Sequence, residues 1–167
     1  MEPVILLLED SENDAILLQY AFRKAGLACP LQVVRDGLDA QAYLMGLGGF
    51  ADREKHPTPN LLVLDLSTPR GNGMELLCWL RTQPALHTLT KVVLTGSAQQ
   101  AQINAAYAMG ANSFLIKPTN TIQLQRMVDS FYQYWIVHNH LPDPTGKLEF
   151  PQHRMASLSP RHSQISS

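Results

Sequence analysis

Five short runs of apolar residues recur along this 167-residue chain, and each is followed by a polar residue. The runs are continuous rather than alternating, which predicts strands that are covered on both faces, as in a parallel sheet. Between them, apolar residues recur at three- and four-residue steps, as in helices. Five alternations of strand and helix predict an α/β domain with right-handed crossovers. The predicted strands lie at residues 4–8, 31–34, 61–64, 92–94 and 114–116.

Capping signals bound the predicted helices. Ser11, Asp36 and Ser97 are candidate N-caps, because their side-chain oxygens can accept from free N–H groups of a first helical turn. Gly110 is a candidate C-terminal stop, since glycine tolerates a left-handed turn. The helices are predicted at residues 14–25, after Asp36, at 75–81, from 97 to 110 and from 121 to 138.

Two segments do not fit the repeat. Residues 46–60 contain paired glycines, two prolines and mixed charges, which predicts a long surface loop before the third strand. Residues 142–167 are rich in proline and serine and poor in large apolar residues, which predicts a flexible tail. We therefore expect one domain over residues 1–141.

The charge balance limits the choice of partners. The 13 Lys and Arg against 14 Asp and Glu give a net charge of −1, so the basic excess of a nucleic-acid-binding protein is missing. No apolar run approaches 18 residues, so we expect no membrane span, and the acidic N-terminus is unlike a signal peptide. We expect a cytoplasmic protein. Cys29 and Cys78 lie in apolar stretches, which predicts buried thiols.

Polar residues stand where four of the predicted strands end. Glu9 and Asp10 follow the first strand, Asp65 the third, Thr95 the fourth and Lys117 the fifth. Ligands of an open parallel sheet bind outside the carboxyl ends of its strands, so we expect these side chains to share one crevice. Each alone has an ordinary explanation, such as a helix-entry acid or a turn lysine. Their meeting at one edge favours a functional site.

Three carboxylates in one crevice need a cation or raised pKa values, because two unit charges 4 Å apart repel by about 4 kcal/mol at an effective dielectric constant of 20. Oxygen ligands with open coordination positions suit Mg²⁺, which favours partners with phosphate oxygens. Lys117 and Thr95 add an ammonium group and a hydroxyl. Such a set is able to transfer a phosphoryl group to a carboxylate.

Other proteins share this architecture. A flavodoxin-type FMN-binding protein needs a cradle of Ser, Thr and Gly after the first strand. This chain has acids there, which repel phosphate unless a cation intervenes: Glu9, Asp10, Glu12 and Asp14. An adaptor that works without phosphorylation stays open as an alternative, since intact residues do not prove their use. Charge and length disfavour a DNA-binding regulator.

The residues at the strand ends resemble the receiver domains of two-component response regulators, and the resemblance covers residues 3–140. It rests on LLED at 7–10, LVLDL at 62–66, VVLT at 92–95 and LIKP at 115–118. The spacings, 30 residues from Asp65 to Thr95 and 22 from Thr95 to Lys117, are typical of receivers. The resemblance implies a doubly wound, flavodoxin-like sheet of five parallel strands in the order 2-1-3-4-5.

The same resemblance implies a function. Asp65 would accept a phosphoryl group from a sensor histidine kinase. Mg²⁺ would be held by Asp10, Asp65 and the main-chain carbonyl of Ser67, with Glu9 acting through water. Receivers promote only their own phosphorylation and dephosphorylation, so we do not expect an enzyme in the ordinary sense.

The resemblance also implies a switch. Thr95 and Lys117 would stabilise the bound phosphoryl group, and Phe114 would turn inward as Thr95 moves. The family commonly has a cis peptide before Pro118. These movements would change the surface around the fourth helix and the fifth strand.

The end of the chain points to output through protein contacts. About 25 residues follow His140, too few for a helix-turn-helix domain, so we expect a stand-alone receiver. The 46–60 loop and the Trp-bearing helix end resemble phytochrome-associated regulators, which implies a phytochrome as the kinase. The last helix is apolar around most of its circumference. We predict a homodimer there rather than a tail folded over it, with Phe131, Tyr132, Trp135 and Ile136 as interface residues.

Overall fold

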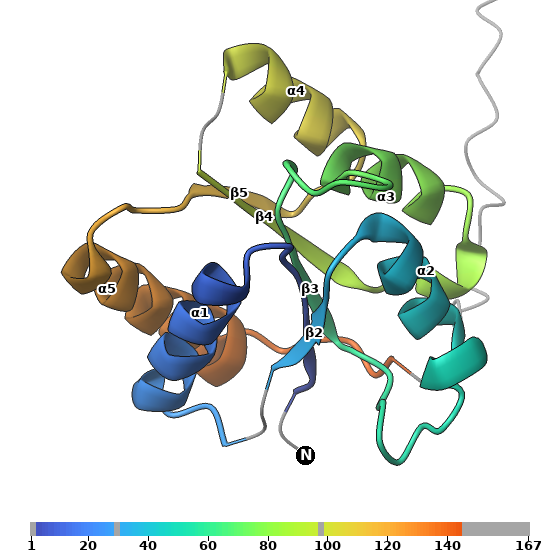
Figure 1. Ribbon diagram of the computed structural model, residues 1–167, viewed down its shortest axis with the longest axis horizontal. Helices are drawn as coiled ribbons and strands as arrows, with labels where there is room; N and C mark the ends of the chain where they lie inside the picture. The colour runs from blue at the N-terminus through green and yellow to red at the C-terminus, as the bar shows by residue number, and fades with distance from the viewer. Residues whose placement is uncertain (1–2, 29–30, 97–98, 145–167) are drawn as a thin grey trace, which may run out of the picture.

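A single five-stranded parallel sheet forms the centre of the protein, in the order β2-β1-β3-β4-β5. The computed structural model describes residues 3–28, 31–96 and 99–144, and Figure 1 shows the arrangement. The strands are β1 (Ile5–Leu8), β2 (Gln32–Val34), β3 (Leu61–Leu64), β4 (Thr90–Thr95) and β5 (Ser113–Ile116). The helices are α1 (Glu12–Ala25), α2 (Gly37–Met45), α3 (Gly73–Leu80), α4 (Gln100–Ala108) and α5 (Thr121–Tyr132), with short helices η1 (Gly48–Phe50), η2 (Pro84–Leu86) and η3 (Gln133–His138).

The helices cover the two faces of the sheet in separate layers. Helices α1 and α5 lie side by side on one face, and α2, α3 and α4 lie on the other (Figure 1). Strands β1 and β3 are buried at every residue, which explains their unbroken Leu, Ile and Val sequences. The predicted α/β class and strand order are both confirmed.

Side-chain caps begin most of the helices. Ser11 accepts from the Asp14 N–H at the start of α1, and Asp36 accepts from the Asp39 N–H at the start of α2, as predicted. Helix α3 begins earlier than predicted, because Asn72 caps it. Gln99 caps α4, and the predicted cap Ser97 lies outside the described residues.

The 46–60 segment is more ordered than a plain surface loop. It contains η1, and its Phe50 and His56 rings pack against the buried ring of Tyr43 in α2. The Arg53 guanidinium donates to the carbonyls of Tyr43 and Leu44, at 2.8 and 2.9 Å. The last carbonyls of a helix have no N–H four residues further along it, and Arg53 adds to the Gly46 cap, whose N–H also donates to the Tyr43 carbonyl.

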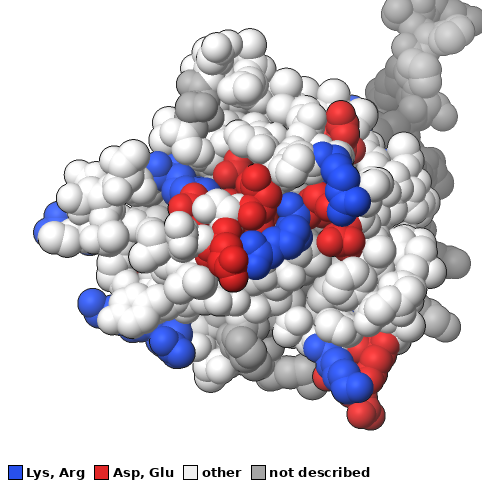
Figure 2. Space-filling model, viewed as in Figure 1, with Lys and Arg blue, Asp and Glu red and all other residues white. Residues whose placement is uncertain are grey.

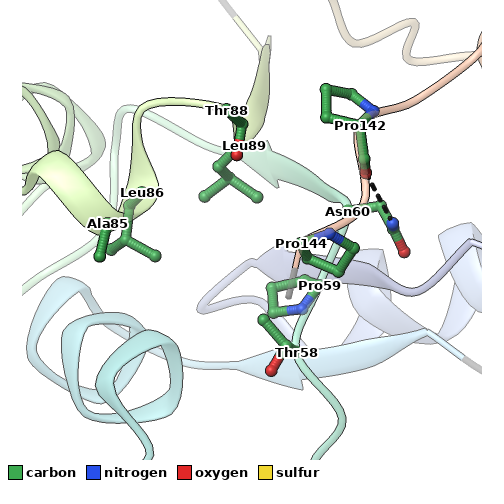
Figure 3. Close-up of a pocket in the computed structure, with 9 residues that line it drawn as sticks. All are labelled: Thr58, Pro59, Asn60, Ala85, Leu86, Thr88, Leu89, Pro142 and Pro144. Atoms are coloured by element: carbon green, nitrogen blue, oxygen red, sulfur yellow. Dashed lines mark hydrogen bonds between the residues drawn. The ribbon is translucent and has the colours of Figure 1, made fainter. Parts of the chain in front are cut away.

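The chain beyond α5 returns to the amino edge of the sheet. The Asn60 carboxamide accepts from the Val4 N–H and donates to the Pro142 carbonyl. Figure 3 shows Pro144 beside Pro59, and Pro142 beside Asn60, at a shallow pocket. Residues 142–144 of the expected tail therefore pack against the domain, and residues 145–167 lie outside the described part of the chain.

The end of the last helix and the exposure of Cys78 differ from the sequence predictions. The predicted last helix continues to His138, but its final six residues form the π-helical segment η3. Cys78 is exposed, so the prediction of a buried thiol is wrong. Helix α3 is apolar almost throughout but buries one face, and Cys78 lies off that face. Cys29 lies outside the described residues. Within the described residues, no helix has the length and apolarity needed to cross a membrane.

Candidate functional site

The carboxyl ends of β1, β3, β4 and β5 bring the predicted residues to one edge of the sheet. Asp and Glu side chains gather there around basic groups, at the centre of the face in Figure 2. Glu9, Asp65 and Thr95 are buried, and Lys117 is largely so. Asp10 is exposed at the rim. The expectation of a shared crevice rested on strand direction, and contacts now join four of the five side chains.

The Asp65 carboxylate is held on both oxygens. Its Oδ1 atom accepts from the Thr95 hydroxyl at 3.0 Å and from the Ser67 N–H at 2.9 Å. Its Oδ2 atom accepts from the Lys117 ammonium at 3.2 Å. Upstream, the Asp65 N–H donates to the Leu8 carbonyl and continues the β1–β3 ladder past the end of the strand. The carboxylate is therefore fixed by groups from three different strand ends.

Lys117 is the centre of the charge cluster. Its Nζ atom donates to Glu9 at 2.6 Å, to Asp14 at 2.9 Å and to Asp65 at 3.2 Å. Burial lowers the pKa of Lys117, but the hydrogen bonds and charges of these carboxylates outweigh it, and the net pKa is raised. Lys117 therefore stays charged at any physiological pH.

Sequence reasoning missed Asp14 as a partner of Lys117. Asp14 lies in the first turn of α1, and its N–H donates to the Ser11 cap. Acids in a first turn usually complement the helix dipole, so the position gave no sign of a second role. Its side chain remains 40% exposed and also borders a cavity of about 300 Å³ between α1 and α5.

Glu9 is the most deeply buried acid of the site, at 1% exposure. Burial raises its pKa, and the nearby Asp65 charge adds to this. The Lys117 ammonium and the Ser11 N–H lower it, but by less. One ammonium thus faces three carboxylates, Glu9, Asp14 and Asp65, and the cluster carries an excess of negative charge.

This excess suits a divalent cation, and the available ligands are oxygens. Within the described residues, no group of three Asp, Glu, His or Cys side chains is placed to hold a metal by itself. The candidate set is therefore two carboxylates, Asp10 and Asp65, and the Ser67 carbonyl. Mg²⁺ commonly binds one or two carboxylates and keeps several waters, so such a set fits this ion better than a closed cage would.

The segment that follows Asp65 passes very close to it. A Cβ atom on Gly73, the first residue of α3, would lie 2.3 Å from the Asp65 carbonyl oxygen, so only glycine fits there. Phe114 lies on β5, opposite Val93, and packs half-buried on the α2–α3–α4 side of the sheet. The Lys117–Pro118 peptide is trans, unlike the form common in receivers.

The sequence matches the family described as "Response regulator receiver domain" over residues 5–129. It is 36% identical over 139 residues to the response regulator Rcp1 of Synechocystis, which covers 83% of this chain and 92% of the relative. The chain belongs to the response regulator receiver family.

Solved structures give the same picture. A phosphorylated cyanobacterial phytochrome response regulator, RcpA, superposes with a TM-score of 0.79 at 31% identity, over 86% of this chain and all of that one. The Mn²⁺-bound form of Rcp1 gives 0.76 at 35% identity, over 84% and 99%. A response regulator in red-light signalling of R. palustris gives 0.79 at 31%, over 84% and 99%. These matches give no support to the FMN-binding alternative.

The raised pKa of Glu9 gives a prediction for Glu9→Gln. A raised carboxyl pKa contributes stability that is full below the unfolded value, near 4.5, and is lost as the pH rises through the folded value. The neutral amide lacks this dependence. In urea unfolding with EDTA, the free energy of unfolding of the variant minus that of the wild type should therefore increase from about pH 5 to about pH 8.

Glu12→Gln is the control, because Glu12 lies three residues after Glu9, at the start of α1, with a side chain that is 75% exposed. Its difference from the wild type should stay nearly constant over the same range. A Glu9→Gln difference that stays constant or falls with pH would contradict the assignment of Glu9 as an acid strained by burial.

Proposed function

We propose that this protein is a response regulator that accepts a phosphoryl group on Asp65 from a sensor histidine kinase and signals through protein contacts. The observation that carries the proposal is the Asp65 carboxylate, which is fixed on both oxygens by Ser67, Thr95 and Lys117. Preorganised donors of this kind stabilise charge that develops on a transferring phosphoryl group.

In the proposed reaction, an Asp65 carboxylate oxygen attacks phosphorus. The phosphorus–nitrogen bond of the donor phosphohistidine breaks, and its electron pair stays on the imidazole nitrogen, which takes a proton from water. Lys117 and Thr95, which contact the Asp65 carboxylate, would neutralise charge on the phosphoryl oxygens and donate a hydrogen bond to them. Asp10, Asp65 and the Ser67 carbonyl would hold Mg²⁺, with Glu9 acting through water, and the ion would neutralise further phosphoryl charge.

The switch would act through the weakly packed side of the fold. Ala106 is the one buried residue of α4, and β5 is partly exposed along its length. A hydrogen bond from Thr95 to an acyl phosphate would change what Phe114 packs against on β5. Because α4 has little buried surface to lose, a small change at Thr95 would be enough to move it.

Several relatives support a phytochrome as the kinase, since their names connect them with phytochromes or red light. We place the reaction in the cytoplasm, where ATP to load such a kinase is available.

The test is phosphotransfer to this protein from a loaded phytochrome kinase and from a sensor kinase of another class. Faster transfer from the second kinase would overturn the phytochrome assignment.

Asp65→Asn tests the acceptor. Wild-type protein treated with acetyl phosphate should gain the mass of one phosphoryl group when Mg²⁺ is present and none in EDTA, because the ion offsets the negative charge of the site. The variant should gain none under either condition. Intact-protein mass spectrometry makes the measurement, with Asp129→Asn, an exposed acid on α5, as the matched control.

A wild-type protein that stays unlabelled while another receiver is labelled would contradict the proposal. It would favour the adaptor that works without phosphorylation. Labelling of Asp65→Asn would instead move the acceptor to another carboxylate.

We also propose a homodimer, on a surface adjusted by the structure. Phe131 cannot serve as an interface residue, because it is buried in the core edge-to-face on Phe22. Tyr132 donates to the Gly26 carbonyl and packs on the end of α1. Trp135 and Ile136 are half-buried, and the apolar residues of η3 that project outward are Tyr134 and Val137, at 60% and 52% exposure. Most of the residues that the helix pattern assigned to an interface thus pack against the rest of the domain instead.

The outward-facing surface lies between β5 and the end of α5. Tyr134, Trp135 and Leu115 line a groove of about 560 Å³ beside the edge strand β5. An edge strand leaves N–H and C=O groups unpaired, and a second copy of the chain would cover them together with the apolar groove.

Tyr134→Arg tests this dimer. Sedimentation velocity at micromolar concentration should show a dimer for the wild type and a shift to monomer for the variant, because a charged side chain would have to be desolvated in the interface. Tyr20→Arg is the matched control, since Tyr20 is similarly exposed on α1. A monomeric wild type would refute the dimer, and equal effects of both substitutions would place the interface elsewhere.

A further inference from the structure

The loop between Asp65 and α3 is tied to the start of α2 by an ion pair. Arg70, in the middle of this loop, donates from Nε and Nη2 to Oδ2 of Asp36, with the Nε bond at 2.9 Å. The Asp36 side chain is 5% exposed, whereas that of Arg70 is 70% exposed. The pair therefore joins a buried carboxylate to a surface guanidinium through two charge-assisted hydrogen bonds.

The Asp36 carboxylate has a second partner. Its Oδ1 atom accepts from the Asp39 N–H at 2.9 Å and caps α2. Burial raises the pKa of Asp36, but this N–H and the Arg70 guanidinium together lower it by more, so the net pKa is below its ordinary value. The carboxylate is thus ionised, and one oxygen is left to hold the loop.

The backbone makes a second contact between the same two segments. A Cβ atom on Gly37, the first residue of α2, would lie 2.1 Å from the Gly71 carbonyl oxygen, so the backbones of the two segments are in direct contact. Arg70 and Gly71 have φ values of +48° and +78°. These two left-handed residues turn the chain so that the Arg70 side chain and the Gly71 carbonyl both face α2.

The loop held in this way is the one that serves the acceptor site. Its Ser67 N–H donates to Asp65 Oδ1, and its Ser67 carbonyl is the main-chain ligand in the proposed cation site. Within the loop, Thr68 is buried and its hydroxyl donates to the Gly71 carbonyl at 3.5 Å, but Ser67, Pro69 and Arg70 are exposed. The contact with α2 therefore adds order that the exposed part of the loop would otherwise have to gain when a cation binds.

We propose that Arg70, through Asp36, is a positioning residue that holds the Ser67 carbonyl in place for the divalent cation. This inference rests on the proposed function, because it concerns the same metal site. Arg70 itself contacts neither the cation nor the phosphoryl group in this account. It acts by fixing the loop before the cation arrives.

Mn²⁺ binding to the phosphate-free protein tests the inference, with free Mn²⁺ followed by electron paramagnetic resonance. Arg70→Ala and Asp36→Asn should each weaken binding about threefold to tenfold. Asn keeps an oxygen for the Asp39 N–H, so Asp36→Asn breaks the ion pair and keeps the cap. The Mn²⁺ affinity of the double variant should be no lower than that of the single variant with the lower affinity, because each substitution removes the same ion pair.

Two further measurements separate positioning from general stability. Arg70→Lys should restore part of the affinity, since one charged hydrogen bond remains available. In metal-free protein, amide exchange within residues 66–72 should be faster in Arg70→Ala, while exchange in β3 stays as in the wild type. Arg126→Ala, an exposed arginine on α5, is the control and should leave both readouts unchanged.

Wild-type affinity in Arg70→Ala, to within about twofold, would overturn the inference and leave the proposed function intact. Losses that multiply in the double variant would overturn it as well, because the two residues would then act independently. A wild-type protein that binds no Mn²⁺ would overturn the metal assignment itself, and the inference with it.

Discussion

The contacts of the Lys117 ammonium with three carboxylates are the interaction on which the proposed acceptor site depends. The ammonium lies within hydrogen-bond distance of Glu9, Asp14 and Asp65, which come from two strand ends and a helix. Without a cation among them, buried carboxylates at such spacing would be protonated or pushed apart. Lys117 allows the chain to bring them together and still leaves negative charge unbalanced. That residual charge suits a divalent ion, as the proposed function requires.

The sheet brings these groups to one edge and supports the two sides of the site unequally. Parallel strands end at one edge, so Asp65 and Thr95 on neighbouring strands come within 3.0 Å of one another. The well-packed β1 and β3 hold the acids rigidly, whereas α4 beyond Thr95 buries a single residue. Rigid support beneath Asp65 and a lightly packed helix beyond Thr95 are properties that would suit the proposed phosphorylation switch.

Although the strand order came from the resemblance to receivers, the parallel sheet and the chemistry at its strand ends could be read from the residues, because buried parallel strands are unbroken apolar runs and their ends share an edge. Glu9, Asp65, Thr95 and Lys117 were found in this way. Contacts that depend on how a loop turns could not be predicted from the sequence. The Arg70–Asp36 pair depends on two left-handed residues that no periodicity reveals, and Asp14 looked like an ordinary helix-entry acid. Helix faces were also misjudged, since an apolar helix such as α3 does not show which side it buries.

Chemical trapping of the acyl phosphate tests the central claim most directly. Borohydride reduces an aspartyl phosphate to homoserine, and peptide mass spectrometry then identifies the modified position. After treatment with acetyl phosphate and Mg²⁺, the account predicts homoserine at position 65, the carboxylate held by Thr95, Ser67 and Lys117. Homoserine at position 10 or 14 in place of 65, or at no position, would contradict it.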